Sequence, residues 1–444
     1  MFGWEFPPHI SGGLGTACYG LTKSLVKQGT EILFVVPKAY GDEDITLINA
    51  SDILVSSEPS IRGNEPADPF VEKGSLYVEK GKMQRITVES EILPYSAVGV
   101  LPSMGLEEWN YTIAPFTPNL IKKDVATGGQ RKYNFSGGYG PHLFQEVMRY
   151  GEAGAAIALQ HDFDVIHAHD WLSFPAGIAA KKASGKPLIV QVHATEFDRA
   201  GSNNVDKRVL AIEKEGLQQA DRIVAVSEWT KQILIAKYGV AKGKIRVVHN
   251  GIVPVKRVPE RRLSRLGKNR VTFLGRITYQ KGPQYFVEAA RKVLEEFPDT
   301  HFVMVGSGDL LPSVIERVAA LKLSSKFHFT GFLRGPQIDQ VWSVSDVYVM
   351  PSVSEPFGIA PLEAIQAGVP VIISNQSGVS EVMPDAIKTD FWDVEALAGS
   401  ICSILRHKSL ARTLKANSKE SLKNITWNKA AGKLTQLYHE VDPN

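Results

Sequence analysis

Two glutamates lie eight positions apart in the segment SVSEPFGIAPLEAIQAG, at Glu355 and Glu363. An apolar strand pattern, DVYVMP, precedes this segment, and a helical pattern covers 357–367. Proline is tolerated at the start of a helix, so Pro356 predicts a helix whose first N–H groups, near Phe357 and Gly358, can meet a phosphate. Glu363 then lies about 9 Å along the helix axis from the predicted first turn, at roughly 1.5 Å per residue. The spacing predicts carboxylates on either side of a diphosphate. A nucleotide sugar has this layout, with Glu355 on the hexose and Glu363 on the ribose diol.

Two cations follow another predicted strand, VTFLG, in the loop GRITYQKG. Arg276 can grip two phosphate oxygens, and Lys281 adds a mobile positive charge. The pair therefore favours diphosphate binding, and the alternative is a solvated turn. Gly306, in the turn VGSGD after the next strand, is compatible with a nucleotide base or phosphate against the backbone.

The N-terminal half carries a glycine-rich loop, HISGGLGT, before a helical pattern. Gly12 and Gly13 would let backbone N–H groups approach an anion, although glycine is equally common in an ordinary tight turn. The spacing matches neither the dinucleotide-binding nor the P-loop motif.

Polar residues also end two neighbouring strands, in HAHDW and QVHATEFDR. His167 and His169 point the same way along a strand, but a third cluster of ligands is not evident, so no metal is expected. Asp170 is better placed to bind sugar hydroxyls. His193 is read either as structural or, because two adjacent strands end in polar side chains, as part of a site.

Apolar strands alternate with helical patterns along two stretches of the chain, which predicts two doubly wound α/β domains with parallel sheets. A charged segment separates the two series, and the opening MFGW reads like the end of a strand whose beginning is absent. We predict an N-terminal Rossmann-like domain, an irregular insertion in it, a basic linker, a C-terminal Rossmann-like domain and a final helix that packs back on the first domain: 1–252, about 41–135, 253–270, 271–425 and 426–444.

Composition excludes several classes of protein. The 444 residues include 43% hydrophobic residues, enough for large cores, and the formal net charge is only +3, which does not favour a nucleic-acid partner. Two distant cysteines, Cys18 and Cys402, predict no disulfide framework. The chain shows neither a secretory signal nor a membrane-spanning run, so a cytoplasmic protein is expected.

Taken together, these motifs resemble the retaining GT-B glycosyltransferases of the glycogen and starch synthase group and the neighbouring family 4 (group 1) enzymes. The resemblance covers nearly the whole chain and includes VHNGI at 248–252. It implies two Rossmann-like domains facing each other across a cleft, the donor on the C-terminal one and the acceptor on the N-terminal one. It also implies roles: Arg276 and Lys281 stabilise the departing diphosphate, Glu363 binds the ribose, Glu355 lies near the donor sugar, and His193 lies near its primary hydroxyl.

Two positions depart from the synthases. Ile10 replaces the lysine of their Lys-x-Gly-Gly-Leu motif, and Phe357 replaces the cysteine of their Glu-Pro-Cys-Gly loop, as in the broader neighbouring family. We therefore expect a hexosyltransferase that takes glucose from ADP-glucose or UDP-glucose to an α-glucan, without a cofactor or metal. The alternatives are a family 4 transferase that builds surface polysaccharide or glycolipid with peripheral membrane contact, a silent carbohydrate-binding protein, and a sugar-nucleotide epimerase.

Overall fold

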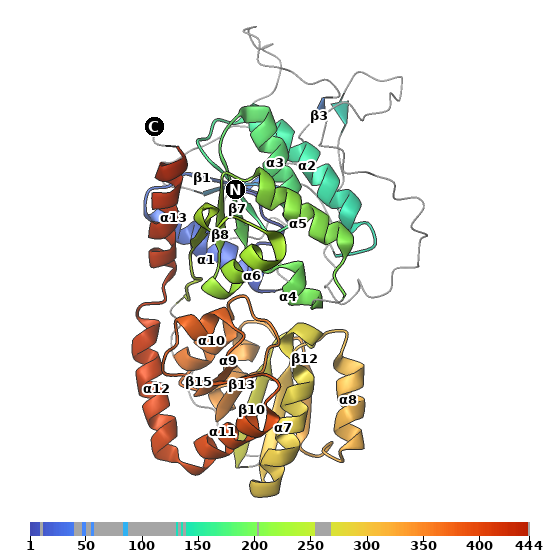
Figure 1. Ribbon diagram of the computed structural model, residues 1–444, viewed down its shortest axis with the longest axis vertical. Helices are drawn as coiled ribbons and strands as arrows, with labels where there is room; N and C mark the ends of the chain where they lie inside the picture. Colours follow the sequence, from blue (N-terminus) through green and yellow to red (C-terminus); the bar gives the residue numbers. More distant parts are fainter. Residues whose placement is uncertain are drawn as a thin grey trace. The chain divides into compact units, whose positions relative to one another are not determined.

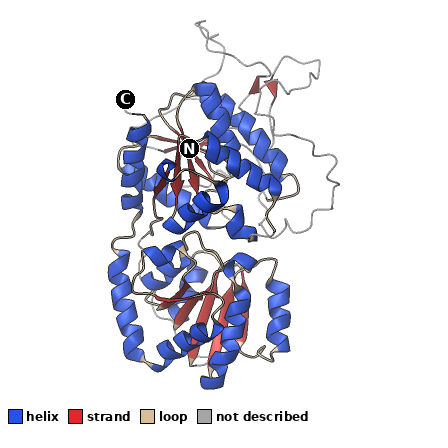
Figure 2. Cartoon of the chain, in the orientation of Figure 1, coloured by secondary structure: helices blue, strands red, loops and turns tan. Residues whose placement is uncertain are grey.

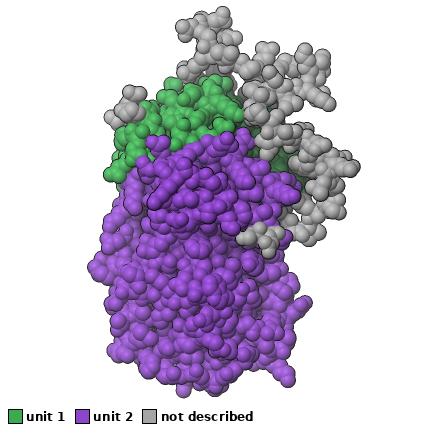
Figure 3. All heavy atoms as spheres, in the orientation of Figure 1, with its two compact units in different colours: residues 1–190, 219–221, 435–444 green, residues 191–218, 222–434 purple. Residues whose placement is uncertain are grey.

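The computed structural model describes most of the chain, and these residues form two compact units (Figure 3). Unit 1 comprises residues 1–190, 219–221 and 435–444, and unit 2 comprises 191–218 and 222–434. His9, Ile10, most of the predicted insertion and most of the predicted basic linker lie outside the described residues. Those are 1–8, 12–39, 47–49, 55–56, 83–87, 130–131, 135, 139–201, 204–253 and 268–442.

Unit 1 contains a parallel sheet built around β1 (Ile32–Val36). On one side β4 (Met83–Thr87) and β2 (Leu47–Asn49) add in the order β1-β4-β2, so part of the region predicted as an irregular insertion extends this sheet. On the other side Phe2 forms parallel bridges to Val35 of β1 and to Ala168 of β6 (Ile166–His169). The opening residues MFGW therefore contribute bridges to the sheet rather than a full strand.

Three helices of the described residues lie wholly within unit 1, and the first covers the helical pattern predicted after the loop HISGGLGT. They are α1 (Gly13–Lys27), α2 (Leu143–Gln160) and α3 (Phe174–Ser184), shown in Figure 1. Tyr150 of α2 is fully buried, and its hydroxyl donates to the carbonyls of Gly3 (3.0 Å) and Val35 (2.8 Å), which ties this helix to the sheet. A separate antiparallel pair joins β3 (Val55–Ser56) and β5 (Gln130–Arg131).

The strands β6–β9 form a four-stranded sheet in sequence order, and the boundary between the units falls within β7 (Leu188–Val192). The segments that follow β7 alternate helix and strand as the sequence predicts. They are α4 (Glu196–Ala200), α5 (Lys207–Gln219), β8 (Arg222–Ala225), α6 (Glu228–Tyr238), η4 (Lys242–Lys244) and β9 (Ile245–Val247).

A six-stranded parallel sheet dominates unit 2, with the order β12-β11-β10-β13-β14-β15. All six strands match predicted ones: β10 (Asn269–Leu274), β11 (Thr300–Val305), β12 (Phe327–Gly331), β13 (Val347–Met350), β14 (Val371–Ser374) and β15 (Ile387–Thr389). In chain order this is 3-2-1-4-5-6, the doubly wound Rossmann arrangement. The order reverses between β10 and β13, and ligands of such sheets bind beyond the carboxyl ends of the strands at this switch point.

Helices surround this sheet, as Figure 2 shows. On β13, Val347 and Val349 belong to one core cluster, whereas Tyr348 and Met350 belong to another, so alternate side chains fill two cores. The helical segments that follow β10 along the chain are η5 (Tyr279–Lys281), α7 (Pro283–Glu296), α8 (Leu311–Ala320), α9 (Pro336–Val344), α10 (Ala360–Gln366), η6 (Gly378–Glu381), α11 (Val394–Arg406), α12 (Lys408–Leu422) and α13 (Trp427–Val441), which extends into unit 1. Within the described ranges, no helix combines the length and the apolar character that a membrane crossing needs.

The last helix, α13, ends in unit 1. There Tyr438 is hydrogen-bonded through its hydroxyl to Nδ1 of His167 on β6, at 2.7 Å, and the two rings meet edge to face. The C-terminal helix thus contacts β6, the strand that precedes Asp170, through Tyr438.

Candidate active site

The loops that leave β10 and β13, at the switch point of the six-stranded sheet, are joined through their backbones. Val353 N donates to the carbonyl of Gln280 at 2.9 Å. Gly282 has a φ of +62°, and a Cβ on it would lie 2.1 Å from the carbonyl oxygen of Pro351. Only glycine lets the backbone at position 282 come this close to Pro351. Gly282 therefore allows the loop of Arg276 and Lys281 to pack against the loop of Glu355.

This junction brings two predicted site residues into direct contact. Lys281 Nζ forms an ion pair with Glu355 Oε2, and Ser352 Oγ donates to the same oxygen at 3.3 Å. The Glu355 side chain is only 8% exposed and the Lys281 side chain 21%. Arg276 Nη2 donates to Oε1 of Gln280, one residue before Lys281, at 3.3 Å. Lys281 therefore contacts Glu355 directly, whereas Arg276 lies in the same loop and contacts the residue that precedes Lys281.

Glu363 lies on α10, eight positions after Glu355. Burial, followed by the charge of Asp339, raises the pKa of Glu363. The pKa of Tyr348 is raised well above its usual value by burial, then by Glu355 and Glu363. The charges of Glu355 and Glu363 thus both act on the phenol of Tyr348, which lies on β13.

The predicted start of the helix after Glu355 is wrong. The helix α10 begins at Ala360, with Pro361 rather than Pro356 in its first turn. Gly358 has a φ of +97°, a left-handed conformation that cannot continue into a helix. Phe357 is buried in the core with 2% exposure, and its carbonyl accepts from Val379 N at 2.7 Å. The backbone of 357–358 thus forms an extended turn before the helix, and the helix N-terminus lies further along the chain than the sequence predicts.

Gly306 has a packing role that sequence spacing alone does not reveal. Its φ is +138°, its N–H donates to Gly331 O at 2.9 Å, and a Cβ on it would lie 1.9 Å from Gly275 O. The glycine therefore closes the turn after β11 against the start of the Arg276 loop.

His193 follows β7 in unit 2, directly before the segment that leads to α4. Burial lowers the pKa of His193 to about 3, so the imidazole is neutral at neutral pH. A neutral imidazole can exchange one hydrogen bond as donor and one as acceptor with a hydroxyl group.

The sequence analysis missed a polar network that holds the Glu355 loop. Ser354 donates to Asp198 Oδ1 and accepts from Trp229 Nε1 at 3.2 Å. Asp198 in turn accepts from Thr195 through its other oxygen, within the capping box of α4. A capping box is visible in the letters TEFD, but the contact with Ser354 spans 156 positions and leaves no local signal.

A second missed network holds the segment after Glu355. Ser227 Oγ donates to Pro356 O at 2.6 Å. Glu381 accepts from the first N–H groups of α6, at Glu228 (2.9 Å) and Trp229 (2.8 Å), and contacts His249 Nε2 at 2.8 Å. Burial opposes the charge of Glu381, but the hydrogen bonds from His249 and α6 prevail and lower its pKa. These contacts connect the segments around α6 and β9 to the six-stranded sheet of unit 2.

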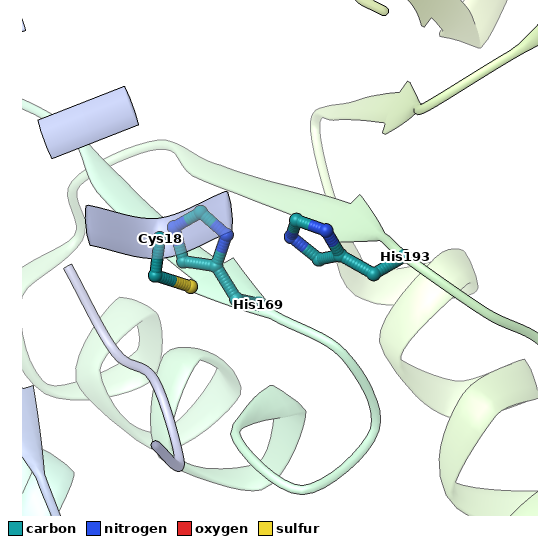
Figure 4. Close-up of side chains that lie close together, drawn as sticks. All are labelled: Cys18, His169 and His193. Carbon is teal, nitrogen blue, oxygen red and sulfur yellow. The ribbon is translucent and has the colours of Figure 1, made fainter. Parts of the chain in front are cut away.

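The predicted residues of the N-terminal loops lie in unit 1. Gly12 caps α1 and Gly13 begins it; a Cβ on either would meet none of the described atoms within 4 Å, so packing does not require glycine there. Asp170 follows β6 with a φ of +60°, a conformation that aspartate tolerates in turns. The Sγ of Cys18 and a ring nitrogen of His169 lie within 4.8 Å of each other (Figure 4). Burial, followed by the charges of Asp170 and Glu5, raises the pKa of Cys18, which therefore stays a thiol at neutral pH.

Comparison with known proteins agrees with this geometry. Residues 113–255 match the model of Glycosyltransferase Family 4, and residues 256–421 match that of Glycosyl transferases group 1. The chain is a GT-B glycosyltransferase. The six-stranded Rossmann sheet that carries Arg276, Lys281 and Glu355 belongs to the group 1 portion of this glycosyltransferase.

Relatives of this glycosyltransferase have several named activities. It is 25% identical to an uncharacterized glycosyltransferase of Methanocaldococcus jannaschii, over 99% of this chain and 97% of the relative. It is 27% identical to the glycogen synthase of Mycobacterium tuberculosis, over 62% of this chain and 68% of the relative. It is 29% identical to the alpha-maltose-1-phosphate synthase of Mycolicibacterium smegmatis, over 62% and 79%.

Solved structures share the fold at lower identity. The sucrose-phosphate synthase of Thermosynechococcus elongatus matches with a TM-score of 0.65 at 20% identity, over 97% of this chain and 93% of that structure. Anabaena HepE, solved in complex with UDP and glucose, matches with a TM-score of 0.58 at 18% identity, over 67% and 82%.

Proposed function

We propose that this glycosyltransferase transfers glucose from a nucleoside diphosphate glucose, ADP-glucose or UDP-glucose, to an α-glucan with retention of anomeric configuration. The observation that carries the proposal is the junction at the switch point. There, Lys281 forms an ion pair with Glu355, Arg276 contacts the residue before Lys281, and a backbone hydrogen bond joins the two loops. Glycogen synthase and alpha-maltose-1-phosphate synthase among the relatives support glucose as the sugar.

The cations serve the leaving group. When the bond between the anomeric carbon and the diphosphate breaks, negative charge develops on the diphosphate oxygens. Arg276 offers a planar fork of donors and Lys281 a point charge, so both stabilise that charge where it forms. Lys281 is paired with Glu355 in the structure, and a diphosphate would share or replace that pairing.

The carboxylates and the histidine hold the two sugars. Glu355 accepts hydrogen bonds from hexose hydroxyls, and Glu363 binds the ribose diol. Burial raises the pKa of Glu363, which suits a group that binds hydroxyls in a dry environment. His193, neutral because burial lowers its pKa to about 3, is assigned to the primary hydroxyl of the hexose. The assignments of Gly12 and Gly13 to an anion and of Asp170 to sugar hydroxyls stay predictions.

The reaction needs no protein nucleophile in this proposal. The acceptor hydroxyl attacks the anomeric carbon from the face that the diphosphate leaves. Its oxygen forms the new glycosidic bond, and its proton passes to a departing phosphate oxygen. The substrates therefore supply both the nucleophile and the group that takes its proton. The protein positions the substrates and supplies positive charge.

A screen of nucleotide sugars against short maltooligosaccharides tests the proposal, with released nucleoside diphosphate and product linkage as readouts. We expect release with ADP-glucose or UDP-glucose, an α-linked product, and loss of release in Lys281→Ala. Lys292→Ala, which removes a lysine paired with the exposed Glu395 on the same unit, is the matched control. Retained turnover in Lys281→Ala would refute the leaving-group assignment.

The second candidate is a family 4 transferase that builds surface polysaccharide or glycolipid at the membrane. Phe357 favours it, because the synthases have cysteine at this place and the neighbouring family does not. A D-inositol 3-phosphate glycosyltransferase of Salinispora tropica, 27% identical over 64% of this chain and 66% of the relative, is named for an acceptor that is not a glucan. Activity restricted to mannose or galactosamine donors in the same screen would select this candidate.

A further inference from the structure

An aromatic side chain stands exposed beside the predicted donor site. Trp392 follows β15 and is 57% exposed, the highest value among the large hydrophobic side chains that the structure describes as exposed. Single exposed hydrophobic side chains are common on protein surfaces, so exposure alone does not mark a site, and the surroundings of the Trp392 ring are decisive.

The Trp392 ring rests on a preformed support. It meets Phe391 edge to face, with ring centroids 4.7 Å apart, and Phe391 meets Tyr285 of α7 at 5.1 Å. The backbone turns tightly here, because Asp393 N donates to Asp390 O and Val394 N donates to Trp392 O, both at 3.0 Å. The ring therefore presents a face in a fixed position rather than on a free loop.

Hydrogen-bonding groups lie next to this ring in the sequence and in space. Asp390 Oδ1 accepts from Gln376 Nε2 at 2.8 Å and from Asn375 Nδ2 at 3.1 Å. Hydrogen bonds from Gln376 and then Asn375 lower the pKa of Asp390, which keeps it ionised. A carboxylate has about four acceptor sites, so two such bonds leave capacity for hydroxyl donors.

This ledge, defined as Tyr285, Asp390, Phe391 and Trp392, is anchored to both loops of the candidate active site. Gln376, which holds Asp390, accepts through its backbone carbonyl from Glu355 N at 2.9 Å. Tyr285, which supports Phe391, donates through its backbone N–H to Gly282 O at 3.1 Å, and Gly282 follows Lys281. The ledge is thus part of the same rigid set of loops as the predicted sugar-binding carboxylate.

We propose that Trp392 and Asp390 form a binding site for a pyranose ring of a glycan chain, beside the donor site. One face of a pyranose carries C–H groups that suit an aromatic ring, and its edge carries hydroxyls that suit a carboxylate. Asp390 and Asp393 flank the ring, and their negative charge disfavours the anionic surface of a membrane. A lone exposed ring is also far smaller than the surface that a stable protein partner buries.

The identity of the chain as an α-glucan rests on the proposed function, because it is the proposed acceptor and product. A site of this kind holds a distant sugar unit of a long chain while the chain end reacts. Trp392 would then contribute to the binding of polymers and long oligosaccharides, and it would not affect short acceptors.

Affinity electrophoresis in gels that contain glycogen, soluble starch or dextran tests the site, together with titration of maltoheptaose followed by tryptophan fluorescence. We expect Trp392→Ala to weaken binding of glycogen or maltoheptaose by about tenfold, which corresponds to about 1.4 kcal/mol. Trp392→Phe should retain most of the binding, and Asp390→Asn should weaken it. Ile315→Ala, at a residue of α8 that is 44% exposed, is the matched surface control and should bind like the wild type.

The outcomes separate this site from the proposed function. Glycan binding that depends on Trp392, without transfer from ADP-glucose or UDP-glucose, would sink the proposed function and leave the site standing. If Trp392→Ala and the wild type have the same KM for glycogen, and also the same KM for maltotriose, the site alone would be overturned. Absence of binding to every glycan tested, equal binding by Trp392→Ala, or a Trp392-dependent association with liposomes in place of glycans would each overturn it as well.

Discussion

Replacing Lys281 by Met should destabilise the protein as well as inactivate it, because the substitution leaves a buried carboxylate without its charged partner. Glu355 is 8% exposed in its side chain, and Lys281 is its charged partner. Breaking a buried pair costs about 3 to 5 kcal/mol, whereas an exposed pair contributes about 0.2 to 1 kcal/mol. Since the Lys281 side chain keeps 21% exposure and water screens it in part, we expect a loss of about 2 to 3 kcal/mol in the free energy of unfolding.

Urea denaturation followed by tryptophan fluorescence and circular dichroism measures this loss. Lys292→Met is the control, because its partner Glu395 is 77% exposed in its side chain, and it should cost less than about 1 kcal/mol. Adding Glu355→Gln to Lys281→Met should recover part of the loss, since a neutral amide is less costly to bury than an unpaired carboxylate. Equal losses for the two lysine variants, or no recovery in the double variant, would show that the pair is effectively solvated and would refute this reasoning.

Three further predictions follow from local geometry and charge. Gly306→Ala should lower the unfolding midpoint in urea strongly, because its Cβ would lie 1.9 Å from Gly275 O; a midpoint within error of the wild type would contradict this. Nδ1 of His301 lies 2.8 Å from Nε2 of His328, and both residues have lowered pKa values. Burial and then the charge of His328 lower the pKa of His301, and burial lowers that of His328. The folded state therefore binds fewer protons than the unfolded state, so stability should fall as pH drops below about 6.5, and His328→Gln should flatten that fall in denaturation at pH 7.5 and 5.5. Burial lowers the pKa of His193 to about 3, so this histidine should not titrate between pH 5 and 8. The dependence of kcat/KM on pH in that range should therefore have the same shape in the wild type and in His193→Asn.

The sheets were predictable because their strands are buried on both faces. VTFLG, DVYVMP and GVPVIIS read as continuous apolar runs between helical patterns, and the structure confirms strands there. None of these runs predicts the 3-2-1-4-5-6 order, because the order depends on which strands pair with one another in the sheet. Local pattern thus gives the elements, and tertiary contacts give their order.

The turn after Glu355 shows where local pattern fails. The letters FGIAPLEAIQ favour a helix from Phe357, but Phe357 is buried in the core and bonded to Val379, and Pro356 O is bonded to Ser227, 129 positions away. These contacts fix Gly358 at a φ of +97° and delay the helix to Ala360. The roles of Ser227 and Glu381 were missed for the same reason, because each has its partners far away in the sequence.

Glu355 is held in place from more than one direction, and this bears on how it could act. Its side chain contacts Lys281 and Ser352, its backbone N–H donates to Gln376, and its carbonyl accepts from Gly378 N at 2.9 Å. A carboxylate on a free loop would lose conformational entropy each time it bound a sugar hydroxyl. Here folding has already fixed the carboxylate, so binding energy from the substrate need not be spent on ordering it. For the proposed transfer, the consequence is that substitutions which loosen this loop without touching the substrate should reduce the rate of transfer as well as affinity.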